Sequence, residues 1–346
     1  MELGSIVVIG ASAGGVEAIL ELVAGLPRDL PAAVCIALHI GARPSTAPEL
    51  FGRAGRLPAV FATDGAPLVP GRIHVAPPDH HLLVAPGRLH LSRGPQENRT
   101  RPAVDPLFRT AAEAYGPAAI GVILSGLLSD GTAGLSAIKG RGGTTVVQDP
   151  RDALYPGMPN SALAHVAVDH CLPVSGMAGL LVRLTKGQEV GPPPSAVTSA
   201  RAKGTVPPTA TARETIRMDG EYELNQPVAL CCPICGGAMK ESSVDSLPYY
   251  SCHIGHRFAA ENMDAAQFDM LEQAMSVALR TLNERTALCE RMATAAEAKH
   301  QTLTARRWRD AAREAGERAE TLRRFLEQDW IRPASNAEDR NETGEG

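Results

Sequence analysis

The sequence predicts an α/β protein whose main unit is a doubly wound, mostly parallel sheet, followed by a small Cys/His metal-binding segment and an α-helical C-terminal module. Up to about residue 186, short apolar runs alternate with amphipathic stretches, which is the pattern of a parallel sheet covered by helices. The composition, with 44% hydrophobic and 21% charged residues, is that of a globular protein. At 346 residues the chain is long enough for two or more folded units.

The sheet-forming unit is expected over residues 1–186. Its buried strands are predicted at 5–9, 32–38, 119–125 and 144–148, with shorter strands at 71–76, 82–84 and 88–91. The last two of these are expected to pair as a hairpin about Pro86-Gly87. A helix is predicted over 13–24, because Val16, Ile19, Leu20 and Val23 recur on one of its faces.

The rest of the chain divides by composition. Residues 187–226 are rich in Pro, Ala, Thr, Ser and Gly, and we predict a flexible linker because they can bury little apolar surface. Residues 227–260 form the Cys/His-rich segment and residues 261–332 the helical, coiled-coil-like module. The polar tail at 333–346 is predicted to be disordered.

Apolar residues of the helical module recur at heptad-like spacing, which is typical of a packed helical seam. One set is Phe268, Met275, Leu282 and Cys289, with Leu271 and Ala278 between them, and a second set is Trp308, Ala312, Ala315, Ala319, Leu322 and Leu326. This spacing predicts either two antiparallel helices or one long helix. The seam suits packing within the chain, a signalling partner or self-association.

Charge and hydropathy exclude two kinds of partner. The formal net charge of −4 leaves no basic footprint, so nucleic acid is not a predicted partner. No apolar run reaches the length of about 18 residues that a membrane-spanning helix needs, so no direct membrane insertion is expected. The opening segment lacks the basic region of a signal peptide, which predicts a cytoplasmic location.

Three polar residues, Ser12, His39 and Asp130, follow three predicted buried strands. The carboxyl ends of parallel strands meet at the edge where open α/β sheets bind ligands. Together these residues can supply the nucleophile, base and orienting carboxylate of a hydrolase, whatever their order in the chain. Taken singly, each has an ordinary alternative: a tight turn, a structural histidine and a helix-capping or turn aspartate.

Ser12 lies in Gly10-Ala11-Ser12-Ala13-Gly14, which fits the G-x-S-x-G turn that exposes a nucleophilic serine between a strand and a helix. Free backbone N–H groups at the start of that helix would face a developing oxyanion. A phosphate-binding loop is the alternative. The glycine spacing does not fit G-x-G-x-x-G, however, and His39 stands where an acidic residue would hold a ribose.

Several ordered blocks resemble the catalytic domain of the bacterial chemotaxis protein-glutamate methylesterases (CheB type). They are residues 9–15, 38–39, 73–77, 98–105, 121–126 and 130–131, so that the resemblance covers roughly residues 4–186. It implies Ser12 as nucleophile, His39 as general base and Asp130 as its orienter, acting on glutamate methyl esters in chemoreceptors. It also implies a glutamine deamidase activity. The proposed chemistry requires no metal or organic cofactor.

The sequence departs from the family pattern at three places. The family typically carries Thr where Ala13 stands and Met where Leu127 stands. Leu127 can still donate its backbone N–H to an oxyanion hole. Members also typically begin with a phosphoacceptor receiver domain, whereas the first catalytic strand is predicted here at about Ser5. We therefore expect that control by phosphorylation of such a domain is absent.

Arg99, Arg101 and Asp105 lie in one of the matching blocks. They are candidates to line the crevice and to bind the acidic flanks of a receptor helix. Solvated surface charges are the alternative interpretation.

Cys232, Cys235, Cys252 and His256 are predicted to bind a structural zinc ion, and they include three of the seven cysteines. Their spacing would close a tetrahedral Cys₃His site without an open position, and clustering favours metal over disulfides. The ion would substitute for the core that about thirty residues cannot supply. Cys231 and His253 are alternates less favoured by spacing, and unligated thiols beside incidental histidines are the remaining alternative.

The leading functional prediction is a protein-glutamate methylesterase that acts on methylated chemoreceptor helices in chemosensory signalling. A non-catalytic signalling scaffold with the esterase fold is one alternative, and the intact Ser, His and Asp count against it. A nucleotide-binding protein is another. The zinc-binding and helical parts are candidates for a regulatory or docking role.

Overall fold

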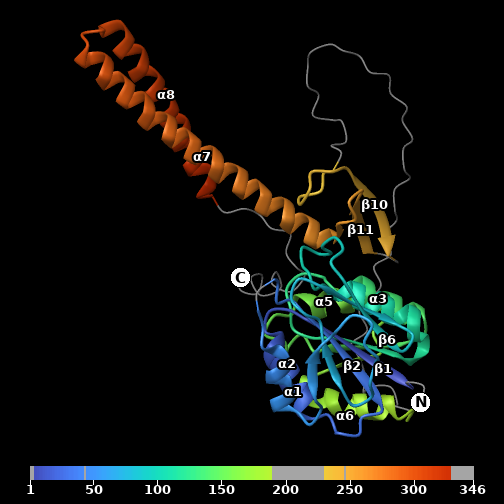
Figure 1. Cartoon of the computed structure of the whole chain (residues 1–346). Coiled ribbons are helices and arrows are strands. Elements are labelled where there is room, and N and C mark those ends of the chain that lie inside the picture. The colour runs from blue at the N-terminus through green and yellow to red at the C-terminus, as the bar shows by residue number, and fades with distance from the viewer. Residues whose placement is uncertain (1–3, 43, 189–229, 245–246, 329–346) are drawn as a thin grey trace, which may run out of the picture.

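A seven-stranded parallel sheet forms the centre of the first unit (Figure 1). The computed structural model describes residues 4–42, 44–188, 230–244 and 247–328. In spatial order the strands are β3 (Ala59–Phe61), β4 (Ile73–Val75), β2 (Ala32–Leu38), β1 (Ser5–Ala11), β7 (Ala119–Ile123), β8 (Thr144–Gln148) and β9 (His170–Leu172). The chain winds outward from β1 in both directions, which is the doubly wound topology that the sequence predicts.

Helices cover both faces of this sheet, because the side chains of each strand alternate between two hydrophobic cores. On β1, Val7 and Ile9 belong to one core, whereas Ile6 and Val8 belong to the other. The first core is closed by α1 (Gly15–Ala24), α2 (Ala47–Ala54) and α6 (Val174–Thr185). The second is closed by α3 (Val104–Tyr115), α4 (Thr132–Gly140) and α5 (Gly157–His165). A short 3₁₀ turn at Gly116–Ala118 follows α3 directly.

The predicted strands are present with small shifts of their ends. Strand β4 is shorter than predicted, β7 ends at Ile123, and the hairpin is formed by β5 (His81–Ala85) and β6 (Arg88–Ser92). Strands β3 and β9 were not predicted. Each has three residues and lies at an edge of the sheet, so neither has the long apolar run that marks a buried strand.

The C-terminal part consists of a small antiparallel sheet and a long helical hairpin (Figure 1). We call residues 230–259 the ribbon; it contains β10 (Met239–Val244), β11 (Leu247–Cys252) and β12 (Arg257–Ala259). The hairpin consists of α7 (Ala260–Ala298) and α8 (Thr302–Leu326), which settles the choice between one long helix and two. The chain reverses at His300, whose φ of 55° ends the first helix.

The helical hairpin is held by a heptad seam of small side chains. Met275 and Cys289 on α7 are buried, as are Ala312, Ala315 and Ala319 on α8. Leu271 and Ala278 were predicted for the seam, but both are exposed, and Leu279 is turned inward instead. For Ala278 the reason is geometric: on α7 the inward positions after Met275 follow at four and then three residues, so the residue three places after Met275 faces solvent.

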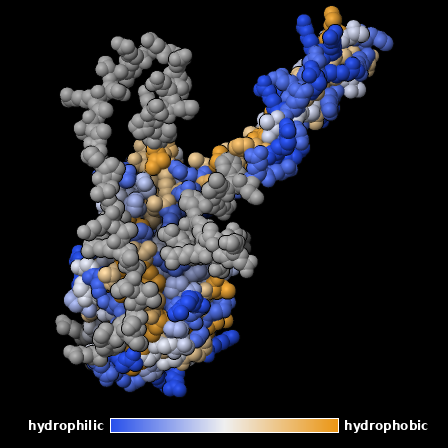
Figure 2. Space-filling model, turned by 180° about the vertical axis from the view of Figure 1, so that it is seen from behind, coloured by the Kyte–Doolittle hydropathy of each residue, from blue (hydrophilic) through white to orange (hydrophobic). Residues whose placement is uncertain are grey.

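The face of the helical hairpin that is seen in Figure 2 is mostly hydrophilic, as its blue residues show. No helix among the described residues is long and apolar enough to span a membrane. The predicted linker lies almost entirely outside the described residues, and the predicted tail lies wholly outside them.

Candidate active site

Three neighbouring strands bring Ser12, His39 and Asp130 together at the carboxyl ends of the parallel strands. Ser12 follows β1, His39 follows β2, and Asp130 lies in the loop between β7 and α4. Since β1 lies between β2 and β7, the sheet winds in opposite directions on either side of the serine. This is the place where open α/β sheets form their ligand crevice.

The side chains of these three residues form a continuous hydrogen-bonded chain. Ser12 Oγ lies 3.0 Å from His39 Nδ1, and His39 Nε2 lies 2.7 Å from Asp130 Oδ2. Because an ionised carboxylate can only accept, Nε2 carries the proton and Nδ1 accepts from the serine hydroxyl. The imidazole is thereby held in the tautomer that a general base needs.

The turn that presents Ser12 is fixed by backbone geometry. The Ser12 N–H donates to the Ser125 carbonyl over 2.9 Å. Gly14 has a φ of 67°, a left-handed conformation that glycine adopts without strain, and α1 begins directly after it. Gly126 is equally constrained, because a Cβ there would lie 2.9 Å from Ser12 Cβ. The segment Gly126-Leu127 therefore passes close beside the serine.

Asp130 is buried and accepts hydrogen bonds from several directions. Besides His39, its donors are the Val104 N–H at 2.7 Å, the Asp105 N–H at 3.2 Å and the Asn98 side-chain amide at 2.8 Å. Burial alone would raise the pKa of Asp130, but His39 and these donors outweigh it and hold that pKa below its ordinary value. The carboxylate therefore stays ionised beside the imidazole.

Asp105, a predicted substrate-binding residue, is fully buried and lines no crevice. Its oxygens accept from the Gly134 N–H at 2.7 Å and from the Asn98 amide at 2.8 Å. Burial, and then the nearby charge of Asp130, raise the pKa of Asp105 to about 7. The prediction that Asp105 meets the substrate is wrong, because its place at the N-terminus of α3 directs it into the protein.

Asn98 was missed as a functional candidate by the sequence analysis. Its amide donates to both Asp105 and Asp130, so one side chain joins two buried carboxylates. Asn98 has a φ of 49°, which asparagine tolerates better than most residues. The only sequence signal was its position in a block that matches a known family, and that signal gave it no role.

Arg99 and Arg101 both have partners within the chain. The Arg101 guanidinium binds Asp79 and the carbonyls of Arg93 and Gly94, and its side chain is only 19% exposed. Arg99 pairs with Asp269 on α7. Arg101 thus joins loops beside the site, and substrate recognition by either arginine stays a prediction.

An exposed apolar rim lies beside the nucleophile. Leu127 is 55% and Leu154 is 69% exposed, and Tyr155 next to them is also exposed. A Cβ on Gly14 would lie 2.9 Å from Leu154 Cβ, which places this rim next to the serine turn. Ser12 and His39 are themselves partly exposed, so a substrate can reach the nucleophile from this side.

The four predicted metal ligands converge in the ribbon. The ligand atoms of Cys232, Cys235, Cys252 and His256 all lie within 4.8 Å of one another. The Cys235 and Cys252 sulfurs are 3.7 Å apart, and His256 Nδ1 lies 3.6 Å from Cys232 Sγ. Zinc–sulfur bonds of about 2.3 Å at tetrahedral angles would separate two sulfurs by about 3.8 Å. Neither alternate, Cys231 or His253, belongs to this cluster.

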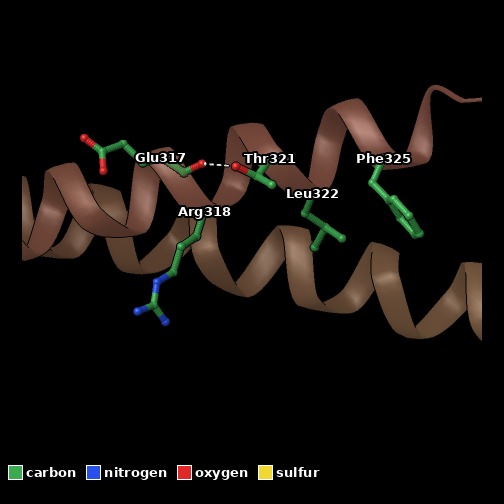
Figure 3. Close-up of a pocket in the computed structure, with 5 residues that line it drawn as sticks. All are labelled: Glu317, Arg318, Thr321, Leu322 and Phe325. Atoms are coloured by element: carbon green, nitrogen blue, oxygen red, sulfur yellow. Dashed lines mark hydrogen bonds between the residues drawn. The ribbon is translucent and has the colours of Figure 1, made fainter.

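A separate concave surface lies on the C-terminal half of α8 (Thr302–Leu326). It is a shallow groove on α8 lined by Glu317, Arg318, Thr321, Leu322 and Phe325 (Figure 3). None of the predicted site residues lies in it. The groove therefore adds nothing to the arrangement of Ser12, His39 and Asp130.

Comparisons with known proteins identify related sequences. A family model described as CheB methylesterase matches residues 7–181. The chain is similar to protein-glutamate methylesterase/protein-glutamine glutaminase 2 of Anaeromyxobacter dehalogenans, with 40% identity over 52% of this chain and 53% of the relative. A corresponding protein of Burkholderia pseudomallei is 42% identical over 50% of this chain and 49% of the relative. The chain therefore spans about half the length of these curated relatives.

A solved structure gives the same result for the fold. The crystal structure of the Thermotoga maritima CheB methylesterase catalytic domain matches with 33% identity and a TM-score of 0.50. The match covers 52% of this chain and 98% of that domain.

Proposed function

The chain belongs to the CheB methylesterase family, and we propose that it hydrolyses the γ-methyl esters of glutamate side chains on chemoreceptors. The observation that carries the proposal is the hydrogen-bonded chain from Ser12 through His39 to Asp130. The names of similar proteins, which include protein-glutamine glutaminase, support glutamine deamidation as a second reaction of the same site.

The proposed reaction is acyl transfer through a covalent intermediate. Ser12 Oγ attacks the ester carbonyl carbon while His39 Nδ1 takes the hydroxyl proton. The tetrahedral intermediate collapses when His39 returns that proton to the methoxy oxygen, and methanol leaves. Water then attacks the acyl-serine with His39 again as base, which releases the glutamate carboxylate and restores Ser12. With a glutamine substrate, ammonia takes the place of methanol.

The developing oxyanion needs hydrogen-bond donors beside Ser12. We assign this role to the backbone N–H of Leu127, because its segment passes against the serine. Backbone N–H groups at the start of α1 stand on the same turn, and they add the positive end of the helix dipole. The side chain at position 127 does not take part in this role, so leucine can serve there.

The exposed rim suits the aliphatic part of a glutamyl ester. Leu127, Leu154 and Tyr155 offer apolar contacts to the methylene groups and the ester methyl. Because the rim is open rather than enclosed, it can admit a side chain that projects from the surface of a receptor helix. Recognition of the flanks of that helix by Arg99 remains part of the proposal.

The decisive experiment measures methanol release from methylated chemoreceptor by the unaltered chain and by Ser12→Ala. We expect the substitution to lower turnover by at least about 10³-fold, because nothing else in the site can form the acyl intermediate. Circular dichroism should show an unchanged fold. Equal turnover by both proteins would contradict the assignment, and no turnover by either would favour a non-catalytic scaffold.

The cluster of Cys232, Cys235, Cys252 and His256 supports a second proposal, a structural zinc ion. Four such ligands would complete the tetrahedral coordination of a zinc ion, which would leave no position for a substrate. The hydrophobic core of the ribbon and the start of α7 is small and includes two of these ligands: Cys232, Cys252, Phe258, Met263 and Ala266. Metal binding would stabilise a unit whose apolar core is too small to do so alone.

A further inference from the structure

The ribbon is hydrogen bonded to the loop that carries Asn98. The Asn98 N–H donates to the Arg257 carbonyl over 2.8 Å, and the Arg257 N–H donates to the Gln96 carbonyl over 3.4 Å. Glu97 and Arg257 also form an isolated parallel bridge. Residues 96–98 thus pair, strand to strand, with β12, although about 160 positions separate them in the sequence.

This pairing determines how the Asn98 side chain is oriented. The Ala259 N–H of β12 donates to Asn98 Oδ1 over 3.0 Å. With its oxygen held there, the NH₂ group must point the other way, where its two hydrogens reach Asp105 and Asp130, each over 2.8 Å. Both amide hydrogens and the amide oxygen of Asn98 are thus hydrogen bonded, and the residue is only 4% exposed.

Two further contacts tie the C-terminal part to the same loops. The Tyr249 hydroxyl on β11 lies 3.4 Å from Asp105 and 3.5 Å from Glu97. Burial and the neighbouring carboxylates raise the pKa of Tyr249, so the hydroxyl keeps its proton and can donate. At the start of α7, the Asn262 amide donates to Ser129 Oγ over 2.9 Å, next to Asp130 in the chain.

Apolar packing supports these polar contacts. Leu247, Tyr249 and Ala259 of the ribbon form one buried cluster with Ala133 of α4. The nucleophile lies on the other side of the carboxylate, where Ser12, His39 and Leu127 stay accessible. The docked ribbon therefore contacts the residues that hold Asp130 and leaves Ser12 and His39 accessible to a substrate.

We infer that the ribbon is a built-in positioning partner of the esterase site, acting on Asp130 through the side-chain amide of Asn98. The inference rests on the proposed function and assigns a positioning residue to it. Asn98 holds the Asp130 carboxylate at the imidazole, and β12 holds Asn98. Undocking of the ribbon would free the amide to rotate, and Asp130 would lose one of the donors that fix its orientation.

The test compares Asn98→Ala, Leu247→Asp and the double variant in the full chain, with a small soluble methyl ester as substrate. Leu247→Asp places a charge in the docking cluster without touching Asp130. We expect each single variant to lower kcat by about 10- to 100-fold while KM changes less than twofold, since orientation rather than binding is lost. Leu288→Asp, the same change at an exposed leucine of α7, should leave kcat unchanged.

The double variant separates positioning from general damage. If the ribbon acts through Asn98, Leu247→Asp adds no loss once Asn98 is replaced, whereas independent effects multiply. Hydrogen exchange at the Asn98 N–H should accelerate in Leu247→Asp, because its acceptor is Arg257. Unchanged hydrogen exchange of the N–H groups that pair β10 with β11 would show that the ribbon is still folded.

Three results would overturn the inference alone: an unchanged kcat in Leu247→Asp despite faster exchange, a multiplicative double variant, or a higher kcat, which would make the ribbon an inhibitor. Absence of turnover by the unaltered chain would instead overturn the proposed function, and the inference with it.

Discussion

The esterase site and the ribbon each gather polar side chains, but they are stabilised in different ways. Ser12, His39 and Asp130 follow strands buried between two hydrophobic cores, so the sheet fixes their spacing. The ribbon has three short strands and one small core, and its ligand cluster lies where a metal would hold the chain together. A large core can preorganise a site without help, whereas a small unit depends on cross-links.

The contact between the two regions changes this comparison. The sheet determines where Asp130 lies, but Asn98 helps to determine how its carboxylate is oriented, and Asn98 is held by β12. The orientation of a carboxylate in the larger unit thus depends in part on a hydrogen bond from the smaller one.

The largest effect is expected from Asp130→Asn, which tests whether the esterase site works as one unit. The amide would favour the wrong tautomer of His39, so kcat should fall by about 10⁴-fold. Methanol release measures the loss, and an unchanged melting temperature would show that the fold persists. A loss below tenfold would mean that Asp130 does not orient the base.

A smaller and local effect is expected from Cys235→Ser, which tests whether metal stabilises the ribbon. Zinc, measured by elemental analysis, should fall from about one ion per chain to a small fraction of that, because a ligand is lost. Hydrogen exchange should accelerate in β10 to β12 and not in β1, β2 or β7. Cys231→Ser is the matched control and should keep its metal; equal metal loss in both variants would contradict the ligand set.

The smallest effect is expected from Asp105→Asn, which probes the buried carboxylate pair that the esterase site has and the ribbon lacks. The pKa of Asp105 is raised from 3.8 to about 7 in the folded chain. Its contribution to stability is therefore fully present below the unfolded pKa and is lost as pH rises through about 7. Denaturant unfolding across this range should show a shallower decline in the variant; an identical decline would contradict the raised pKa.

Much of the fold was predictable because its signals are local. Apolar runs identified the strands at 32–38 and 144–148 within their observed bounds, and heptad spacing identified the inward residues of α8. The short edge strands β3 and β9 were not predicted, since three residues are too few to show the hydrophobic periodicity of a strand. The heptad spacing also placed Leu271 and Ala278 wrongly in the seam. A seven-residue repeat identifies one inward position per heptad, but it does not say whether the next inward residue follows after three or after four positions.

The sequence by itself determined which residues stand at the strand ends and which cysteines can share a metal, because both follow from spacing along a short stretch of chain. Only the tertiary structure decided that Asp105 is buried, that Arg101 binds Asp79, and that Asn98 joins two carboxylates. The physical reason is that these outcomes depend on contacts between distant segments, above all between residues 96–98 and β12. Neither hydrophobic periodicity nor a sequence motif predicts a pairing between segments so far apart in the chain.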